Sequence, residues 1–206
     1  MKTGVSSSHV GDWLIVKATL ESSNNFSQSG EIIGWASWLH ENPNINQEIA
    51  THLSANKGQA DQDSERKLLE FEQGLGAFVR RHQTRLYADW YGKRLYKSGA
   101  PNLSGFLSLR ACFILPGFQR HGIGSALVRY GCERADRLKL DTLVTSTPVA
   151  KPLYETTGDF EAFDCLEVDL KEWGIDIECE NQLARSQKTA SNYRFWFMAR
   201  TFQRLK

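Results

Sequence analysis

The chain has 206 residues, with 25 basic and 24 acidic side chains and a formal net charge of +1. This length suits a single domain over residues 1–206 with a hydrophobic core of its own. The balanced charge excludes a bulk field that would attract nucleic acid or an acidic membrane surface, so a charged ligand must be held by local groups.

The cysteines give the first indication of cellular compartment. They are Cys112, Cys132, Cys165 and Cys179. No two of them form a CxxC pair, and this spacing is unlike that of a zinc site or a dense disulfide framework. We therefore expect no metal and a reducing interior. The apolar run near the N-terminus has four residues before Lys17, too few for a signal peptide or a membrane span. These features predict an intracellular, cytoplasmic protein with no nucleic-acid or membrane partner.

The N-terminal part of the chain predicts two strands and then helix. Segments 12–21 and 31–40 are rich in β-branched and aromatic residues and flank a turn-rich stretch, so we expect an antiparallel hairpin. The first strand of the chain is predicted to start near Trp13. Segment 41–97 is more polar and then shows apolar residues at helical spacings, which predicts an amphipathic helix or helix pair.

The centre of the chain predicts a strand, a helix and a second strand in a right-handed parallel crossover. FLSLRACFILP is apolar on both faces and ends at Pro116, as expected of a central strand. GIGSALVRYGCERADRLKL follows as a helix whose apolar stripe runs from Ile123 to Leu138, and DTLVTSTP is the next strand. A short helix ending near Gly158 and two final strands, FEAFDCLEVDL and YRFWFMART, complete an α/β fold.

The loop GFQRHGIG, between the central strand and its helix, indicates an anion-binding site. Free backbone N–H groups meet there at the positive end of the helix dipole. Gly122 and Gly124 leave the backbone open to a phosphate. Two glycines at a helix start also occur for turn geometry alone, and the loop is neither a P-loop nor a full dinucleotide fingerprint. Taken alone, the loop predicts no more than an α/β phosphate binder.

Two segments carry a more specific resemblance. PGFQRHGIGSALV resembles the Q/R-x-x-G-x-G/A signature of the GNAT superfamily of N-acetyltransferases, with Gln119, Gly122 and Gly124 at the defined positions. PLYETTGDF resembles the later Leu-Tyr-x-x-x-Gly-Phe segment of the same family. Here Asp159 separates the glycine and the phenylalanine that are normally adjacent, so we expect an altered exit from this helix.

The resemblance implies the GNAT acyl-CoA N-acyltransferase fold. That fold has a mixed, mostly antiparallel central sheet flanked by helices, and we expect it to splay between strands 107–115 and 142–146. The family's opening strand and helices are not evident before Trp13. The chain is therefore expected to have a shortened N-terminus and a helical insertion at 41–97 that could replace the missing wall of the acceptor site.

The resemblance also implies acetyl-CoA as a cosubstrate, with the strand pairing to the pantetheine arm and the loop amides holding the diphosphate. The residues assigned to it are Cys112, Phe113, Ile114, Gln119, Arg120, His121, Gly122, Ile123, Gly124 and Ser125. Tyr154 matches the family's general acid, which would give a proton to the leaving sulfur. A packed aromatic on a short helix is the structural alternative for this tyrosine.

The implied reaction is direct transfer of an acetyl group to the primary amine of a small molecule or peptide. The general base stays open between a water relay and an acid from segment 41–97, since Arg110 and Thr145 stand where an acid was sought. Cys112 as an acyl-carrying nucleophile is disfavoured, because a lone cysteine in an apolar strand usually packs in a core. The competing interpretation is an inactive acyl-CoA-binding or protein-interaction module of the same fold. The oligomeric state is not predicted.

Overall fold

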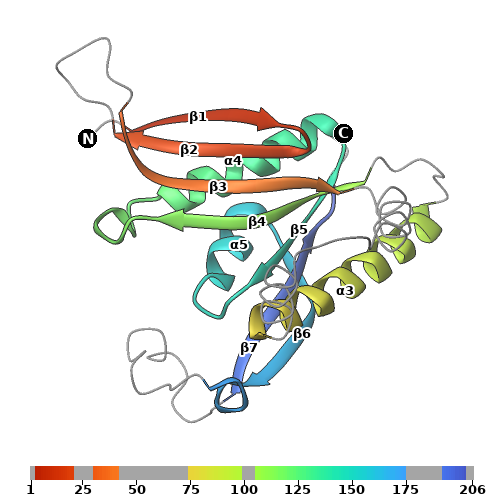
Figure 1. Ribbon diagram of the computed structural model, residues 1–206. Coiled ribbons are helices and arrows are strands. Elements are labelled where there is room, and N and C mark those ends of the chain that lie inside the picture. The colour runs from red at the N-terminus through yellow and green to blue at the C-terminus, as the bar shows by residue number, and fades with distance from the viewer. Residues whose placement is uncertain (1–2, 21–29, 42–73, 99–104, 175–191, 203–206) are drawn as a thin grey trace, which may run out of the picture.

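The computed structural model describes residues 3–20, 30–41, 74–98, 105–174 and 192–202, and within them the strands form one seven-stranded sheet (Figure 1). Its strand order is β1-β2-β3-β4-β5-β7-β6. The strands are β1 (Thr3–Val10), β2 (Trp13–Leu20), β3 (Glu31–Glu41), β4 (Phe106–Ile114), β5 (Asp141–Ser146), β6 (Glu161–Asp169) and β7 (Asn192–Arg200).

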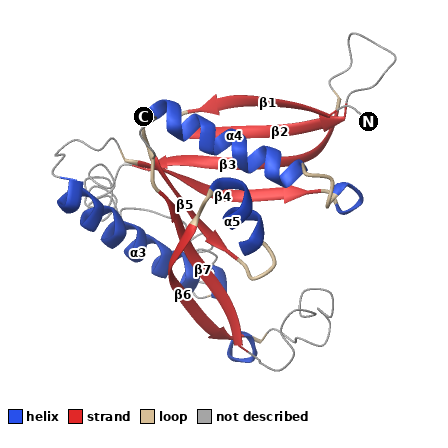
Figure 2. Cartoon of the chain, turned by 180° about the vertical axis from the view of Figure 1, so that it is seen from behind, coloured by secondary structure: helices blue, strands red, loops and turns tan. Residues whose placement is uncertain are grey.

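Helices cover both faces of the sheet. In Figures 1 and 2, α4 and α5 lie on one face and α3 lies on the other. The bounds are α3 (Leu75–Ser98), α4 (Ile123–Leu138) and α5 (Lys151–Gly158), with short 3₁₀ turns η1 (Pro116–Phe118) and η2 (Leu170–Trp173). No helix in the described segments is long and apolar enough to cross a membrane.

The predicted pairings of the sheet are confirmed. β2 and β3 form the antiparallel hairpin, and the β4-α4-β5 crossover brings β4 and β5 together as a parallel pair. β7 lies between β5 and β6 and is antiparallel to both. The sheet is therefore mixed and mostly antiparallel, with its one parallel pair at the centre.

The prediction that the first strand starts near Trp13 is wrong. β1 precedes it, and the turn at Gly11, whose φ is +57°, brings Val10 opposite Trp13. The sequence TGVSSSHV is rich in serine and mostly exposed, so it lacks the apolar alternation by which a strand is recognised. β1 is an edge strand, which needs no such alternation because neither of its faces lies in the core.

The helical prediction for 41–97 is confirmed for residues 75–97, whereas Glu41 is the last residue of β3. Residues 75–98 form α3, whereas residues 42–73 lie outside the described residues, as does Cys179. The structure places α3 in the chain between β3 and β4, and in space against β7.

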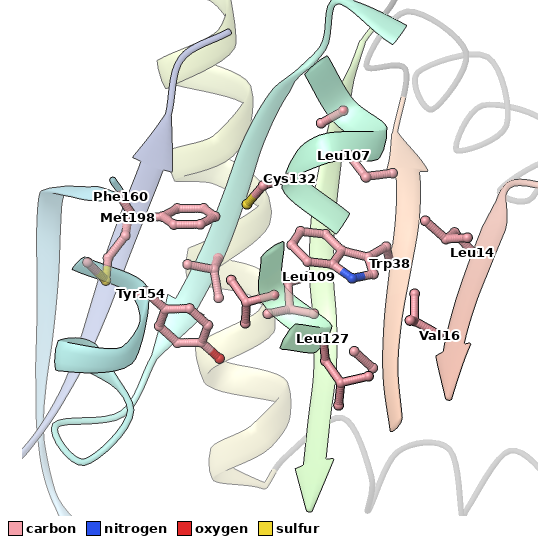
Figure 3. Packing of buried hydrophobic residues seen from close by; sticks show 14 of the residues in the cluster. Leu14, Val16, Trp38, Leu107, Leu109, Leu127, Cys132, Tyr154, Phe160 and Met198 are labelled. Atoms are coloured by element: carbon pink, nitrogen blue, oxygen red, sulfur yellow. The ribbon is translucent and has the colours of Figure 1, made fainter. Parts of the chain in front are cut away.

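Within the described residues, two apolar clusters form the core, one on each face of the sheet. The α4 face holds Trp38, Leu109, Leu127, Cys132, Tyr154, Phe160 and Met198 among its members (Figure 3). The α3 face holds Tyr87, Tyr91, Phe106, Leu143, Phe197 and Ala199. The predicted stripe of α4 is buried except at its end, because Leu138 lies in the last turn and is 42% exposed, while Cys132 joins the core instead.

Gly131 sits against the largest of these buried side chains. A Cβ added there would lie 2.0 Å from Cε2 of Trp38, whose side chain is fully buried. Such overpacking forces a shift of the helix or the indole, so we expect Gly131→Ala to lower the free energy of unfolding by about 3 kcal/mol in urea denaturation.

The matched control is Gly92→Ala in α3, where an added Cβ meets no atom within 4 Å. That substitution should raise the free energy of unfolding by about 0.5–1 kcal/mol, because alanine is the better helix former. Equal changes in the two variants would show that Gly131 and Trp38 are not in the close contact described.

Candidate active site

The sheet opens between β4 and β5. The two strands pair only from Phe106 opposite Asp141 to Leu109 opposite Val144, although β4 continues to Ile114. A register shift against β3, where Ser37 and Trp38 face Ala111 and Leu109, places an extra residue in β4 at the point of separation. Beyond it, the edge of β4 that faced β5 has no strand partner among the described residues. The predicted splay is thus present, and it leaves backbone groups of β4 available to a ligand.

The loop after β4 delivers unpaired amides to the mouth of this opening. The first amide of α4 that donates to a preceding carbonyl is that of Ala126, to the Gly122 oxygen at 3.0 Å. The amides of Ile123, Gly124 and Ser125 precede it and have no intrahelical acceptor. Gly122 is the N-cap residue with φ +78°, a conformation that favours glycine. Arg120 is also left-handed, with φ +65°.

A groove with a volume of about 700 Å³ joins the opening to the loop. Its lining includes eight of the ten residues assigned to the cosubstrate, namely Cys112, Phe113, Ile114, Gln119, Arg120, Gly122, Gly124 and Ser125. Tyr154 lines the same groove. The volume is in the range of small-molecule sites, and the Arg120 cation and the amino end of α4 give one end of the groove an anion-binding character.

Two assigned side chains point elsewhere. Ile123 is 6% exposed and belongs to the core under α4, so only its backbone amide is available to a ligand. The exposed His121 ring lies 2.8 Å from the Gln119 carbonyl through Nδ1 and does not line the groove. The resemblance covers the loop as a continuous segment, whereas these two side chains of the loop do not line the groove.

Tyr154 is held by its own helix and by Phe160. Its ring packs edge-on against Phe160 with centroids 5.9 Å apart, and Figure 3 shows the hydroxyl directed toward the side of Leu127. Burial raises the pKa of Tyr154, and the neighbouring Cys112 raises it further. The phenol therefore keeps its proton at neutral pH and can act as a donor.

Cys112 is the thiol in this groove. Burial raises the pKa of Cys112 to about 11, so at neutral pH it is a protonated thiol and a poor nucleophile. This agrees with treating it as a packing residue rather than as an acyl carrier.

The altered helix exit is accommodated by Asp159. This residue caps α5 in the left-handed conformation, with φ +53°, which aspartate tolerates better than most residues. The next amide, of Phe160, donates to the Tyr154 carbonyl at 3.4 Å. The extra residue thus leaves Phe160 packed against the Tyr154 ring.

The opposite face of the opening is covered by α3. Tyr87, from the middle of this helix, is buried and has its hydroxyl 3.1 Å from Oγ1 of Thr145 on β5. Burial raises the pKa of Tyr87, and the Glu41 charge also raises it. Arg110, which stands where the sequence analysis expects a general base, donates to the Glu41 carboxylate at 3.4 Å.

The comparisons with known proteins bear on this geometry. The sequence profile of the Acetyltransferase (GNAT) family matches residues 20–158 of the chain. This span includes the open pair of strands, the loop and Tyr154. The chain belongs to the GNAT family. A search of curated protein sequences gives no significant match.

Several solved acetyltransferase structures are similar to this chain at low sequence identity. A mutant agmatine N-acetyltransferase in its apo form has a TM-score of 0.50 and 12% identity, covering 90% of this chain and 73% of its own. Mosquito arylalkylamine N-acetyltransferase like 5b has a TM-score of 0.49 and 13% identity, with coverages of 90% and 73%. The IAA acetyltransferase from Bacillus cereus ATCC 14579 has a TM-score of 0.42 and 14% identity, with coverages of 91% and 77%.

Part of this GNAT groove was missed from the sequence. The groove is also lined by residues just before α5 and in its first turn, which are Val149, Ala150, Pro152 and Leu153. The signal was available, because these residues immediately precede Tyr154 in the same predicted helix. The polar set on the α3 face, from Tyr87 to Glu41, could not be found by pattern, since its members come from separate elements.

Proposed function

We propose that this GNAT protein transfers an acetyl group from acetyl-CoA to a primary amine by direct attack. The observation that carries the proposal is the single groove that brings together the free edge of β4, the amides at the start of α4 and the Tyr154 side chain. Acetyl-CoA supplies an activated thioester to this groove. The family uses this donor, and no group of metal-binding side chains occurs in the described residues.

In this proposal the chain's own residues bind and orient the donor from one face. The free edge of β4 at Cys112 to Ile114 pairs with an amide-bearing arm, as another strand would. The amides of Gly122 to Ser125 and the Arg120 side chain hold phosphate oxygens. Ile123 and His121 contribute backbone groups only.

Tyr154 performs the proton transfer. As the amine attacks, the bond between the acetyl carbon and sulfur breaks, and the Tyr154 hydroxyl gives its proton to the departing sulfur. The raised pKa keeps the hydroxyl protonated until then. The phenolate recovers its proton through solvent.

The amine reaches the thioester from the α3 face. Tyr87, Thr145 and the Arg110–Glu41 pair line that side of the opening, and helix α3 takes the place of a wall there. The proton that the amine must lose passes to water or to the Glu41 carboxylate. The agmatine N-acetyltransferase to which this chain is similar supports a small amine as one class of acceptor.

The setting proposed for this reaction is the cytoplasm. The cysteines in the described segments, Cys112, Cys132 and Cys165, are all free thiols, which fits a reducing compartment that also contains acetyl-CoA.

The test of this function is thiol release from acetyl-CoA by the purified chain against a panel of amines, including agmatine and an arylalkylamine. Turnover with at least one primary amine is expected, with no release in the absence of an amine. Binding of acetyl-CoA without turnover on any amine would favour the inactive acyl-CoA-binding module instead.

A further inference from the structure

An exposed pair of aromatic side chains lies on the face of the sheet opposite α4. Trp35 on β3 and Phe113 on β4 are cross-strand partners, and they are 38% and 53% exposed. Ala36, Cys112 and Ile114, which flank them in the two strands, lie in or against the apolar core under α4. Because side chains alternate along a strand, Trp35 and Phe113 project from the opposite face. We call these two residues the aromatic pair.

The aromatic pair takes no part in the packing of aromatic rings within the protein. The ring contacts of the described residues include neither member. In Figure 1, α3 lies over the same face near β5 and β7, away from the end of β4 that leads into the loop. Both rings are therefore open to a ligand, and neighbouring exposed apolar side chains of this size are typical of a binding surface.

Phe113 joins the aromatic pair to the candidate active site. It lies in the part of β4 beyond Leu109, the last residue that pairs with β5, and it lines the acetyl-CoA groove. Its neighbour Cys112 faces the α4 side, where Tyr154 also lines the groove. One step along a strand is about 3.3 Å, so the Phe113 side chain starts beside the opening. It does so on the face from which the amine is proposed to enter.

A cation marks the far side of the aromatic pair. Lys17 on β2 is the cross-strand partner of Trp35, and it is exposed on the same face because Val16 and Ala18 beside it are in the core. Neighbouring strands are about 4.8 Å apart, so Phe113, Trp35 and Lys17 follow one another across the face, starting from the opening. A second positive charge on a bound amine would meet Lys17, whereas an uncharged ring would lie on the two aromatic side chains.

We propose that the acceptor of this chain is a primary amine that carries a neutral aromatic ring. The ring lies on the aromatic pair, and a linker of a few carbons reaches from it to the opening between β4 and β5, where the amine meets the thioester. Trp35 and Phe113 thus determine specificity and take no part in the chemistry. The inference rests on the proposed acetyl transfer, because it assigns the acceptor of the same site.

The test measures binding and turnover of three amines, which are 2-phenylethylamine, butan-1-amine and agmatine. Binding is measured by calorimetric titration of the whole chain saturated with coenzyme A, and turnover by thiol release from acetyl-CoA. We expect 2-phenylethylamine to bind at least about tenfold more tightly than the other two, because only its ring can pack on the aromatic pair. Agmatine should bind more tightly to Lys17→Gln than to the wild-type chain, because the repulsion is removed.

Trp35→Thr should raise KM for 2-phenylethylamine about tenfold, since the ring loses one of its two aromatic contacts. The kcat for this amine, the KM for butan-1-amine and the affinity for acetyl-CoA should stay nearly unchanged, which a general loss of structure would not allow. Threonine suits an exposed strand position, so the variant should fold. The matched control is Trp13→Thr, because Trp13 is 39% exposed on β2 and is paired with Leu39, four residues along β3 from Trp35.

The outcomes separate this inference from the proposed function. Tighter binding of 2-phenylethylamine without turnover of any amine would support the aromatic site and contradict the enzyme. Turnover with no preference for 2-phenylethylamine would overturn the inference and leave acetyl transfer in place. The inference is also overturned if none of the three amines binds, or if Trp35→Thr and Trp13→Thr have the same affinity for 2-phenylethylamine.

Discussion

Replacing Tyr154 with phenylalanine is expected to lower kcat for acetyl transfer by about 10²–10³, the loss that follows removal of a positioned proton donor. The ring that packs on Phe160 is retained, and only the hydroxyl of this groove-lining residue is removed. Acetyl-CoA affinity should change less than about threefold, since the free edge of β4 and the loop amides are untouched. Steady-state thiol release and calorimetry on the same preparation separate the two effects.

The matched control for this change is Tyr130→Phe. Tyr130 lies on α4, outside the groove, and its hydroxyl is 2.6 Å from the Ser7 side chain on β1. Loss of the Tyr130 hydroxyl should leave kcat unchanged and lower the free energy of unfolding only slightly. If Tyr154→Phe turned over at the wild-type rate, Tyr154 would be a packed aromatic and the proton would come from elsewhere.

Gly122→Glu is expected to weaken acetyl-CoA binding by about 100-fold or more. An added side chain at this N-cap meets no atom within 4 Å, so the protein can fold around it. Its φ of +78° adds strain of about 1–2 kcal/mol. The larger effect on binding is electrostatic, because a carboxylate at the helix start occupies the site of the phosphate and repels it.

Two companion variants separate charge from strain. Gly122→Ala carries the strain without the charge and should lose less than about tenfold in affinity. Gly117→Glu adds the same charge to η1, where an added Cβ also meets nothing and the residue does not line the groove. Wild-type affinity for acetyl-CoA in a folded Gly122→Glu protein would show that the diphosphate does not bind at this loop.

The central elements could be predicted because the order of apolar and polar residues in each element indicates which of its faces is buried. β4 is apolar on both faces and α4 carries a helical stripe, so the crossover was evident from hydrophobic period alone. β1 was missed because an exposed edge strand needs no apolar face. Leu138 was predicted to be buried because it continues the apolar period of the helix. That period gives no information about where the neighbouring sheet ends.

The groove could be predicted only where its lining residues are contiguous in the sequence. Gly122, Gly124 and Tyr154 lie in two short motifs, and the structure brings these motifs to one groove. The Tyr87–Thr145 contact and the Arg110–Glu41 pair join residues from four separate elements, and such contacts depend on topology rather than on local pattern. The splay was predicted through the resemblance to the GNAT family, whereas the register shift against β3 at the same point was not.

The measurement that tests the central claim most directly is calorimetric titration of the wild-type chain with acetyl-CoA. The comparison ligand is S-acetylpantetheine, a thioester that lacks the diphosphate. One-to-one binding of acetyl-CoA is expected, with much weaker binding of the thioester that lacks the diphosphate. No binding of acetyl-CoA, or equal binding of both ligands, would contradict the assignment of the groove and of the amides at the start of α4.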